Sequence, residues 1–298
     1  MAIAIRQLHS ICGEVEGLDL RRPLAPAEVA AIHAGMDRFG VLVFHDQALT
    51  DDEQLAFSRS LGPLEEVEGG HIYRREELRL AEGLADVSNL DRDGRPLERD
   101  DRRRMFGLGN RLWHSDSSYR VIPAKYSILS GRSVASSGGD TQFADMRAAY
   151  DALDEETRAQ VEDLVCEHSL IHSRGLLGFS EFTAEEKAKF APVLQRLVRT
   201  HPVTGRKSLY LSSHAGGIVG WPVPEARSFL RDLIEHATQR EFVHAHRWRV
   251  NDLVMWDNRQ TMHRVRPFRD TVERRDMRRT TIAGDGPTVA QEIRRTGT

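Results

Sequence analysis

The sequence predicts a mainly β protein that also contains helices (an α+β fold), with a β-sandwich or jelly roll at its core and helical insertions. The first observation is a series of short apolar runs separated by turns, which is typical of strands. The second is that two stretches with helical spacing interrupt this series, as in a β-rich domain decorated by helices. Because the chain shows no internal repeat and no low-complexity linker, we expect a single domain over residues 1–298.

The first expected elements are a helix and a strand. Apolar residues at helical spacing predict a helix over 26–39, and the apolar run 41–44 directly after it predicts a buried strand. Thr50 followed by Glu53 is a capping box, in which each side chain bonds to the other residue's backbone N–H. It predicts a second helix, which ends near the Gly62-Pro63 pair and packs on the sheet.

A charged stretch with several arginines follows, at residues 65–110. A single strand is expected within it, at 85–89. Long loops of this kind often cover active sites. We therefore expect 65–110 to be a loop region that covers the substrate.

The second part of the chain alternates strands with helices. Strands are expected at 126–130 and 141–144, with a Gly138-Gly139 turn between them. Helical patterns over 146–164 and a capping box at Thr183 and Glu186 predict a helical insertion at 145–200. The remaining expected elements are strands at 208–211, 241–249, 253–256 and 275–282, and a helix at 224–238.

Composition excludes several classes of protein. The net charge is −3, so no excess of positive charge indicates nucleic-acid binding. No apolar run approaches the roughly 18 residues of a membrane span. No secretory signal is evident at the N-terminus, so we expect a cytoplasmic protein. The two cysteines, Cys12 and Cys166, are far apart and lack metal-binding spacing, so no chemistry is assigned to them.

His114 and Asp116 form the most informative motif. If the run around them is extended, both side chains point to one face, so one strand end can supply two ligands. Two imidazoles and one carboxylate on one face of a metal are the ligand set of non-heme Fe(II) oxygenases. A His-x-Asp pair alone is more often a surface pair, but the neighbouring Trp113 and Tyr119 indicate a cavity wall. His263, beyond the polar turn that ends an apolar strand, is the candidate third ligand.

The arginines near the C-terminus are the second important feature. Seven lie between Arg264 and Arg279, and a strand at 275–282 places Arg275, Met277 and Arg279 on one face. A guanidinium in a barrel mouth favours a bidentate carboxylate, because an unpaired buried charge is costly. A small dicarboxylate such as 2-oxoglutarate fits this need. The alternative is a solvated edge strand whose acidic residues are counter-charges.

Two further alternatives stay open on residue types. His244 and His246 form a second same-face pair, which could supply a cupin-like metal site, but no suitable acidic partner is apparent and Trp248 on the same face favours packing. A non-enzymatic protein whose arginines bind an acidic partner or nucleic acid is disfavoured by the acidic net charge and by the absence of interleaved aromatics over 269–279.

Several motifs resemble those of a known family. They are Leu112-Trp113-His114-Ser115-Asp116-Ser117-Ser118, Gly138-Gly139-Asp140-Thr141, His236-Ala237-Thr238-Gln239-Arg240-Glu241-Phe242, Asp252-Leu253-Val254-Met255-Trp256-Asp257-Asn258-Arg259, and Arg274-Arg275-Asp276-Met277-Arg278-Arg279. Over nearly its whole length the chain resembles the Fe(II)- and 2-oxoglutarate-dependent dioxygenases of the taurine/2,4-dichlorophenoxyacetate family, above all the aryloxyalkanoate enzymes. The resemblance implies a double-stranded β-helix (jelly roll) core.

The resemblance also implies a role for individual residues. It implies that His114, Asp116 and His263 are the catalytic iron ligands, and that Thr141 and Arg275 hold the distal carboxylate of 2-oxoglutarate. It implies that Arg279 faces the substrate's acid group or assists the co-substrate, and that His214, Asn89 and Trp113 lie at the substrate, with Trp256 nearby. Tyr73 is a further candidate for the substrate side, in a loop where this chain departs from the family, since it carries an aromatic where relatives can place a lysine.

The implied reaction consumes O2 and 2-oxoglutarate at Fe(II), with ascorbate as a stimulant. An aryloxyalkanoate such as 2,4-dichlorophenoxyacetate is hydroxylated beside its ether oxygen, giving a phenol and a 2-oxo acid together with succinate and CO2. Asp116 favours hydroxylation, since halogenating relatives lack this carboxylate. A sulfonate or another small carboxylate is the alternative substrate. The expected partners are therefore small acids, with no nucleic acid and no membrane, and the expected assembly is a homo-oligomer.

Overall fold

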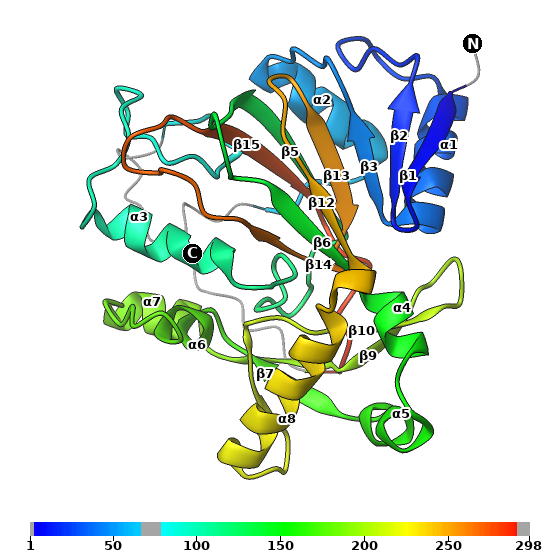
Figure 1. Cartoon of the computed structure of the whole chain (residues 1–298), viewed down its shortest axis with the longest axis vertical. Coiled ribbons are helices and arrows are strands. Elements are labelled where there is room, and N and C mark those ends of the chain that lie inside the picture. Colours follow the sequence, from blue (N-terminus) through cyan, green and yellow to red (C-terminus); the bar gives the residue numbers. More distant parts are fainter. Residues whose placement is uncertain (1–2, 67–78, 291–298) are drawn as a thin grey trace.

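The computed structural model describes residues 3–66 and 79–290, and its main feature is a seven-stranded sheet (Figure 1). The strand order is β1-β2-β3-β13-β5-β15-β4, antiparallel except between β2 and β3. The strands are β1 (Ala4–His9), β2 (Cys12–Glu16), β3 (Val41–Phe44), β13 (Leu253–Asp257), β5 (Tyr126–Ser133), β15 (Asp276–Ile282) and β4 (Ala85–Asp86).

A second, three-stranded sheet lies against the inner face of the first. Its order is β12-β6-β14, formed by β12 (Val243–His246), β6 (Thr141–Asp145) and β14 (Thr261–Val265). Side chains alternate between the faces of a strand. Val254 and Trp256 of β13 therefore point inward and join Phe143 of β6 in one buried cluster. This core between two sheets of mainly antiparallel strands is the jelly-roll arrangement that the strand pattern predicts.

Two helices cover the outer face of the large sheet. They are α1 (Pro26–Phe39) and α2 (Asp51–Leu61), and the outward residues Leu253 and Met255 of β13 pack in a cluster with both of them (Figure 1). The capping box of Thr50 and Glu53 is present, since the Thr50 hydroxyl accepts from Glu53 N–H at 3.2 Å. The sequence predictions for both helices and for β3 are confirmed.

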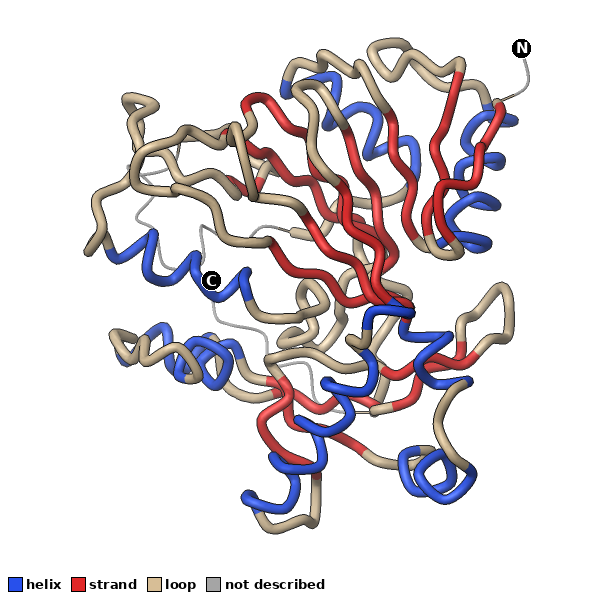
Figure 2. Tube along the Cα trace, viewed as in Figure 1, coloured by secondary structure: helices blue, strands red, loops and turns tan. Residues whose placement is uncertain are grey.

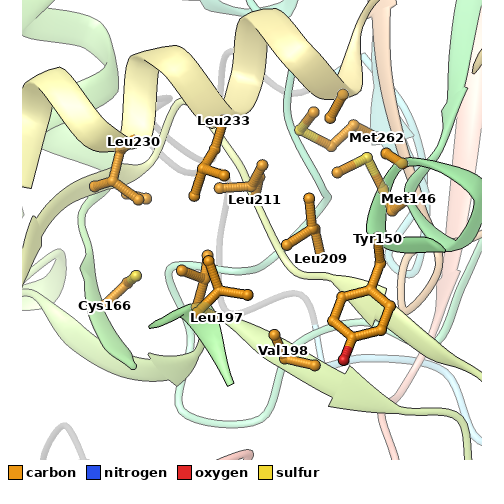
Figure 3. Packing of buried hydrophobic residues seen from close by; sticks show 14 of the residues in the cluster. Met146, Tyr150, Cys166, Leu197, Val198, Leu209, Leu211, Leu230, Leu233 and Met262 are labelled. Carbon is orange, nitrogen blue, oxygen red and sulfur yellow. The ribbon is translucent and has the colours of Figure 1, made fainter. Parts of the chain in front are cut away.

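A further layer packs at the end of the β-sandwich where β6 and β14 meet α4. It contains β7 (Val165–His168), β8 (Val193–Arg196), β9 (Val198–Thr200), β10 (Lys207–Leu209) and β11 (Ala215–Ile218), with the helices α4 (Met146–Asp151), α5 (Glu155–Val161) and α8 (Val223–Ala237). Figure 3 shows Leu230 and Leu233 of α8 directed toward Leu211 and Leu197 beneath the helix.

Three short helices and one 3-10 turn gather beside the open end of the sandwich. They are α3 (Arg102–Gly107), η2 (Leu108–Arg111), α6 (Leu170–Gly175) and α7 (Ala184–Lys189). Figure 2 shows them on the periphery, while strands fill the centre. A cluster of phenylalanines that includes Phe106, Phe179 and Phe182 joins them. Among the described helices, none has the length and apolar content to cross a membrane.

The structure also differs from the sequence predictions. The strand expected at 85–89 is only β4, two residues long, and α3 lies in the expected loop region. The expected strand at 241–249 begins with a 3-10 turn, η3 (Arg240–Phe242), before β12. Strands β7, β8 and β9 lie within 145–200, together with the predicted helices. The hairpin β1–β2 and strand β14 were not predicted, because both carry short, mixed patterns that do not stand out in the sequence. Strand β14 pairs with β6, which is distant in the chain.

Candidate metal centre

His114 and His263 are brought together by a direct backbone pairing. His114 N donates to His263 O at 3.0 Å, and His263 N donates to His114 O at 2.9 Å. The two imidazole centroids are 4.1 Å apart. His263 lies in β14, which the sequence did not predict, and this strand carries it from the turn after β13 to the motif near residue 114.

Asp116 completes the group by a route that differs from the expected extended run. Only His114 forms a strand-like bridge, and Asp116 begins a turn in which Ser117 has the left-handed φ of 56°. The carboxylate nevertheless lies 3.9 Å from His114 Nε2 and 3.6 Å from His263 Nε2. In the part of the chain that the structure describes, this is the single group of three residues whose ligand atoms all lie within 4.8 Å of one another.

The protonation states suit a metal ion. His114 Nδ1 lies 2.8 Å from the carbonyl oxygen of Leu112, which can only accept, so the proton sits on Nδ1 and Nε2 keeps its lone pair. Burial lowers the pKa of His114. Burial also lowers the pKa of His263, and the electrostatic effect of the neighbouring His114 lowers it further. Burial alone would raise the pKa of Asp116, but the charge of Arg279 and the imidazoles outweighs burial and holds this pKa well below its usual range.

A hydrogen-bond network fixes the Asp116 carboxylate. The Ser127 hydroxyl donates to Asp116 Oδ2 at 2.7 Å, and Arg279 Nη1 donates to Asp116 Oδ1. Asn258 accepts from Asp116 N at 3.0 Å and donates to the Ser127 hydroxyl at 2.9 Å. Such outer contacts orient a ligand before the metal binds. Two imidazole nitrogens and one fixed carboxylate fit a divalent first-row metal with one face open.

Arg275 directly precedes β15, and Thr141 lines the same cavity. Arg275 is fully buried, and burial lowers its pKa to about 10 in spite of the nearby Asp140 charge. Its side chain donates to Gly139 O at 3.3 Å, and among the described residues no carboxylate lies within 4.0 Å of it. A buried guanidinium in this state fits an incoming carboxylate.

The strand that carries the two arginines is internal. Residues of β15 pair with β5 on one side and with β4 on the other, so the reading as a solvated edge strand is wrong. Arg275, Met277 and Arg279 share the inner face, as the sequence predicts, even though a bulge lies between Asp276 and Met277.

A cavity of about 210 Å³ connects the candidate metal ligands to the two arginines. His214 and Asn89 line it, as expected. Asn89 also ties down the segment before β15, because its amide donates to Asp270 O at 2.6 Å and accepts from Arg275 N at 2.8 Å. The apolar walls of the cavity are formed by Val87, Leu90, Leu97, Phe106, Leu108, Leu129, Leu170, Trp256, Val265 and Phe268.

One expected substrate residue, Trp113, does not line this cavity. Trp113 is buried in the cluster behind the site, where the Arg264 guanidinium lies 4.5 Å from its ring centroid. Tyr73 lies outside the described residues.

Tyr119 lines the cavity, as the sequence indicates, and its ring stands edge-on to His214 at 4.9 Å. The sequence missed Arg174 of α6, which also lines the cavity. No local pattern marks Arg174, because it reaches the cavity only through the packing of α6.

The second histidine pair has an acidic partner that the sequence did not reveal. His246 Nε2 lies 3.0 Å from Asp252 Oδ2, and the other carboxylate oxygen lies 2.5 Å from His45 Nδ1. His244 is separate and lies against the ring of His9. In the described residues this network does not form a three-ligand group, so a cupin-like site is not supported.

The comparisons with known proteins match this geometry. The family model described as "Taurine catabolism dioxygenase TauD, TfdA family" matches residues 4–281. The chain is 46% identical, over 96% of its length and 99% of the relative's, to an alpha-ketoglutarate-dependent 2,4-dichlorophenoxyacetate dioxygenase from Cupriavidus pinatubonensis. It is 38% identical to an (S)-phenoxypropionate/alpha-ketoglutarate-dioxygenase from Delftia acidovorans, covering 82% of this chain and 83% of that protein.

Solved structures give the same result. The crystal structure of AAD-2 with Mn(II) and N-oxalylglycine is 62% identical with a TM-score of 0.94, covering 97% of this chain and 100% of that one. A taurine dioxygenase from Burkholderia xenovorans is 30% identical with a TM-score of 0.77, covering 96% and 91%.

Proposed function

Because this chain belongs to the TauD/TfdA family of 2-oxoglutarate-dependent dioxygenases, we propose that it hydroxylates an aryloxyalkanoate at the carbon beside the ether oxygen. The resulting hemiacetal breaks down to a phenol and a 2-oxo acid, while 2-oxoglutarate gives succinate and CO2. The observation that carries the proposal is the 46% identity to a 2,4-dichlorophenoxyacetate dioxygenase over nearly the full length of both chains.

We propose that His114, Asp116 and His263 hold Fe(II). Their buried, converging ligand atoms and their protonation states support this assignment. Bound Fe(II) supplies the activation of O2 that couples decarboxylation of 2-oxoglutarate to hydroxylation of the substrate. The three side chains would supply two imidazole nitrogens and one carboxylate to the metal, the ligand set that non-heme Fe(II) oxygenases use.

The remaining roles concern binding and orientation. We propose that Arg275 and Thr141 hold the distal carboxylate of 2-oxoglutarate. The burial of Arg275 supports this, as does the lack of any carboxylate within 4.0 Å of it among the described residues. Arg279 holds Asp116 with Nη1, while its Nε has no partner in the described part of the chain, and we propose that this guanidinium also faces the substrate's acid group. His214 and Asn89 would complete the substrate side. Orientation of the C–H bond near the metal is the protein's contribution to the rate.

Two regions are proposed to serve this site within one domain over 1–298. Residues of 65–110 that line the cavity, among them Val87, Phe106 and Leu108, support a covering role for that region. The insertion at 145–200 supplies Leu170 and Arg174 to the same cavity. A homo-oligomer remains a prediction, which sedimentation of the purified protein would check.

The test is oxygen consumption and succinate formation with Fe(II), ascorbate and 2-oxoglutarate. The substrates are aryloxyacetates, (R)- and (S)-aryloxypropionates, and taurine. We expect turnover with aryloxyalkanoates and release of the matching phenol. Turnover with taurine alone would instead indicate that the substrate is a sulfonate. Strongly salt-dependent binding of nucleic acid without turnover of 2-oxoglutarate would contradict the assignment of the protein as an enzyme.

A further inference from the structure

Trp248 lies directly behind the proposed co-substrate residue Thr141. Its indole Nε1 donates a hydrogen bond to Thr141 Oγ1 at 2.9 Å, and the two side chains are both buried. Thr141 is the first residue of β6, whereas Trp248 follows β12, the strand beside it. Thr141 lines the cavity that holds the candidate metal ligands, whereas Trp248 is not among the residues that line it.

The direction of this hydrogen bond determines what the Thr141 hydroxyl can do. An indole N–H only donates, so the Thr141 oxygen must accept, and its own proton stays available for another partner. A carboxylate only accepts. With the indole in place, the hydroxyl is free to donate to a carboxylate that also binds Arg275, which lines the same cavity.

We infer that Trp248 is a positioning residue for the co-substrate: it orients the Thr141 hydroxyl toward the distal carboxylate of 2-oxoglutarate. The inference rests on the proposed function, in which Thr141 and Arg275 bind that carboxylate. It adds a residue that touches neither the metal nor the co-substrate and acts through Thr141.

A buried polar network holds the indole in place. The His246 ring stands edge-on to it at 4.9 Å and 87°, and His246 Nε2 bonds to Asp252 at 3.0 Å. Asp252 also bonds to His45 at 2.5 Å and accepts from Arg249 N at 2.8 Å. Burial alone would raise the pKa of Asp252, but these hydrogen bonds outweigh it and keep the carboxylate ionised. The orientation of Trp248 is thus fixed from the side away from the cavity.

A glycine leaves room for the ring. A Cβ on Gly131 would lie 3.2 Å from Trp248 Cε3 and 3.4 Å from Val134 Cγ1. A methyl group there would push the indole by a few tenths of an ångström without removing its N–H. Gly131→Ala is therefore a mild displacement of Trp248, to be compared with its replacement.

The competing explanation is packing alone. Trp248 belongs to the cluster that contains Phe143, Trp256 and Met277, so its loss could weaken the site through the core. A packing role would affect ligands with and without a distal carboxylate alike. It would also act independently of the Thr141 hydroxyl, whereas a positioning role would act only through it.

The experiment is a double-mutant cycle read out by ligand binding. Trp248→Phe, Thr141→Val and the double variant are loaded with Mn(II), and dissociation constants are measured by calorimetry without turnover. The ligands are 2-oxoglutarate and 2-oxopentanoate, which carries a methyl group in place of the distal carboxylate. Trp221→Phe, in a separate cluster packed against Phe229, is the matched control.

We expect Trp248→Phe to raise the dissociation constant for 2-oxoglutarate roughly 3- to 10-fold, the range for losing one hydrogen bond. Binding of 2-oxopentanoate should not change, and the double variant should bind no more weakly than Thr141→Val. Gly131→Ala should show a smaller loss with the same ligand selectivity, and it serves in place of Trp248→Phe if that variant does not fold. Trp221→Phe should bind both ligands as the unmodified chain does.

Two results would overturn the inference. One is equal weakening of both ligands by Trp248→Phe, and the other is additive losses in the double variant. An unchanged affinity in Thr141→Val would refute the co-substrate assignment of Thr141, and with it the basis of the inference. A loss in Thr141→Val without one in Trp248→Phe would refute the role of Trp248 alone.

Discussion

The Arg279 guanidinium donates to Oδ1 of Asp116, so a cation from β15 holds the only carboxylate of the candidate metal centre. Four residues earlier on the same strand face, Arg275 has no such partner among the described residues. The two guanidinia therefore differ in function although they share one face. Arg279 is bound to the metal-ligand side of the cavity, and Arg275 is free to take a carboxylate.

This difference predicts separate defects. Arg275→Gln should raise the apparent KM for 2-oxoglutarate by the equivalent of about 2 to 4 kcal/mol, the range for losing one partner of a desolvated charge pair, and should change the substrate KM less. Arg279→Gln should weaken the binding of an aryloxyacetate more than that of 2-oxoglutarate. It should also weaken the binding of the metal ion, because Asp116 loses a hydrogen bond that orients its carboxylate. Steady-state kinetics with both substrates and a metal titration measure these effects. Equal changes in all constants for the two variants would contradict the division.

Loss of any candidate metal ligand should abolish the reaction. We expect His114→Ala, Asp116→Ala and His263→Ala each to lose Fe(II) binding and substrate-dependent succinate formation, because two ligands cannot keep the geometry. His244→Ala is the matched control, since His244 packs on His9 away from the cavity, and it should keep most of both. The assignment fails if His244 proves essential for iron binding and the three candidate ligands do not.

We expect Arg174 to contribute to substrate selectivity, and a substitution at Gly109 tests this while the charge of Arg174 is kept. A Cβ on Gly109 would lie 2.2 Å from Arg174 Nη1, so Gly109→Ala must displace this guanidinium from its place over Phe106. We expect the KM for an aryloxyalkanoate to rise by roughly 10-fold, equivalent to about 1.4 kcal/mol. The KM for 2-oxoglutarate should stay within about twofold. Gly175→Ala, whose Cβ meets nothing within 4 Å, should change neither constant. A matching rise in both would assign Gly109 a general structural role.

We expect Asp257 to make a contribution to the free energy of unfolding that depends on pH. It is fully buried and accepts from Arg259 Nε at 2.9 Å and Nη2 at 2.7 Å. Burial alone would raise its pKa, but Arg259 and His201 outweigh burial and hold the pKa below its usual range. A depressed folded pKa means that the stabilisation is complete above the unfolded value, about 3.9, and is lost as the pH falls through the folded one.

Asp257→Asn should therefore lower the free energy of unfolding by up to about 3 kcal/mol at neutral pH, since it leaves Arg259 with less charge compensation. The gap between the variant and the unmodified chain should narrow below about pH 4. Denaturant unfolding at several pH values measures it. Asp232→Asn, which removes an exposed partner of Arg231, should cost at most about 0.5 kcal/mol throughout. A gap that stays constant down to the acid limit would exclude the ionised pair as its source.

Local sequence determined the elements that depend on nearest neighbours. The helical spacing over 26–39 and the Thr50–Glu53 capping box specify α1 and α2, because i, i+3 and i, i+4 contacts and cap hydrogen bonds form within a few residues. The period of two in 275–282 likewise specifies that Arg275 and Arg279 share a face. The motif around His114 and the paired arginines were sufficient to indicate the metal, the co-substrate and the family.

Only the tertiary structure decided which distant residues meet. His263 reaches His114 because β14 pairs with β6 and then bridges to residue 114, and a strand of five residues carries too little pattern to predict that pairing. Arg174, the Asp252 carboxylate between two histidines, and the Trp248–Thr141 hydrogen bond depend equally on contacts between segments far apart in the chain. Local propensity sets the conformation of a segment, whereas burial and pairing with remote segments set its neighbours, and the chemistry of this site depends on the neighbours.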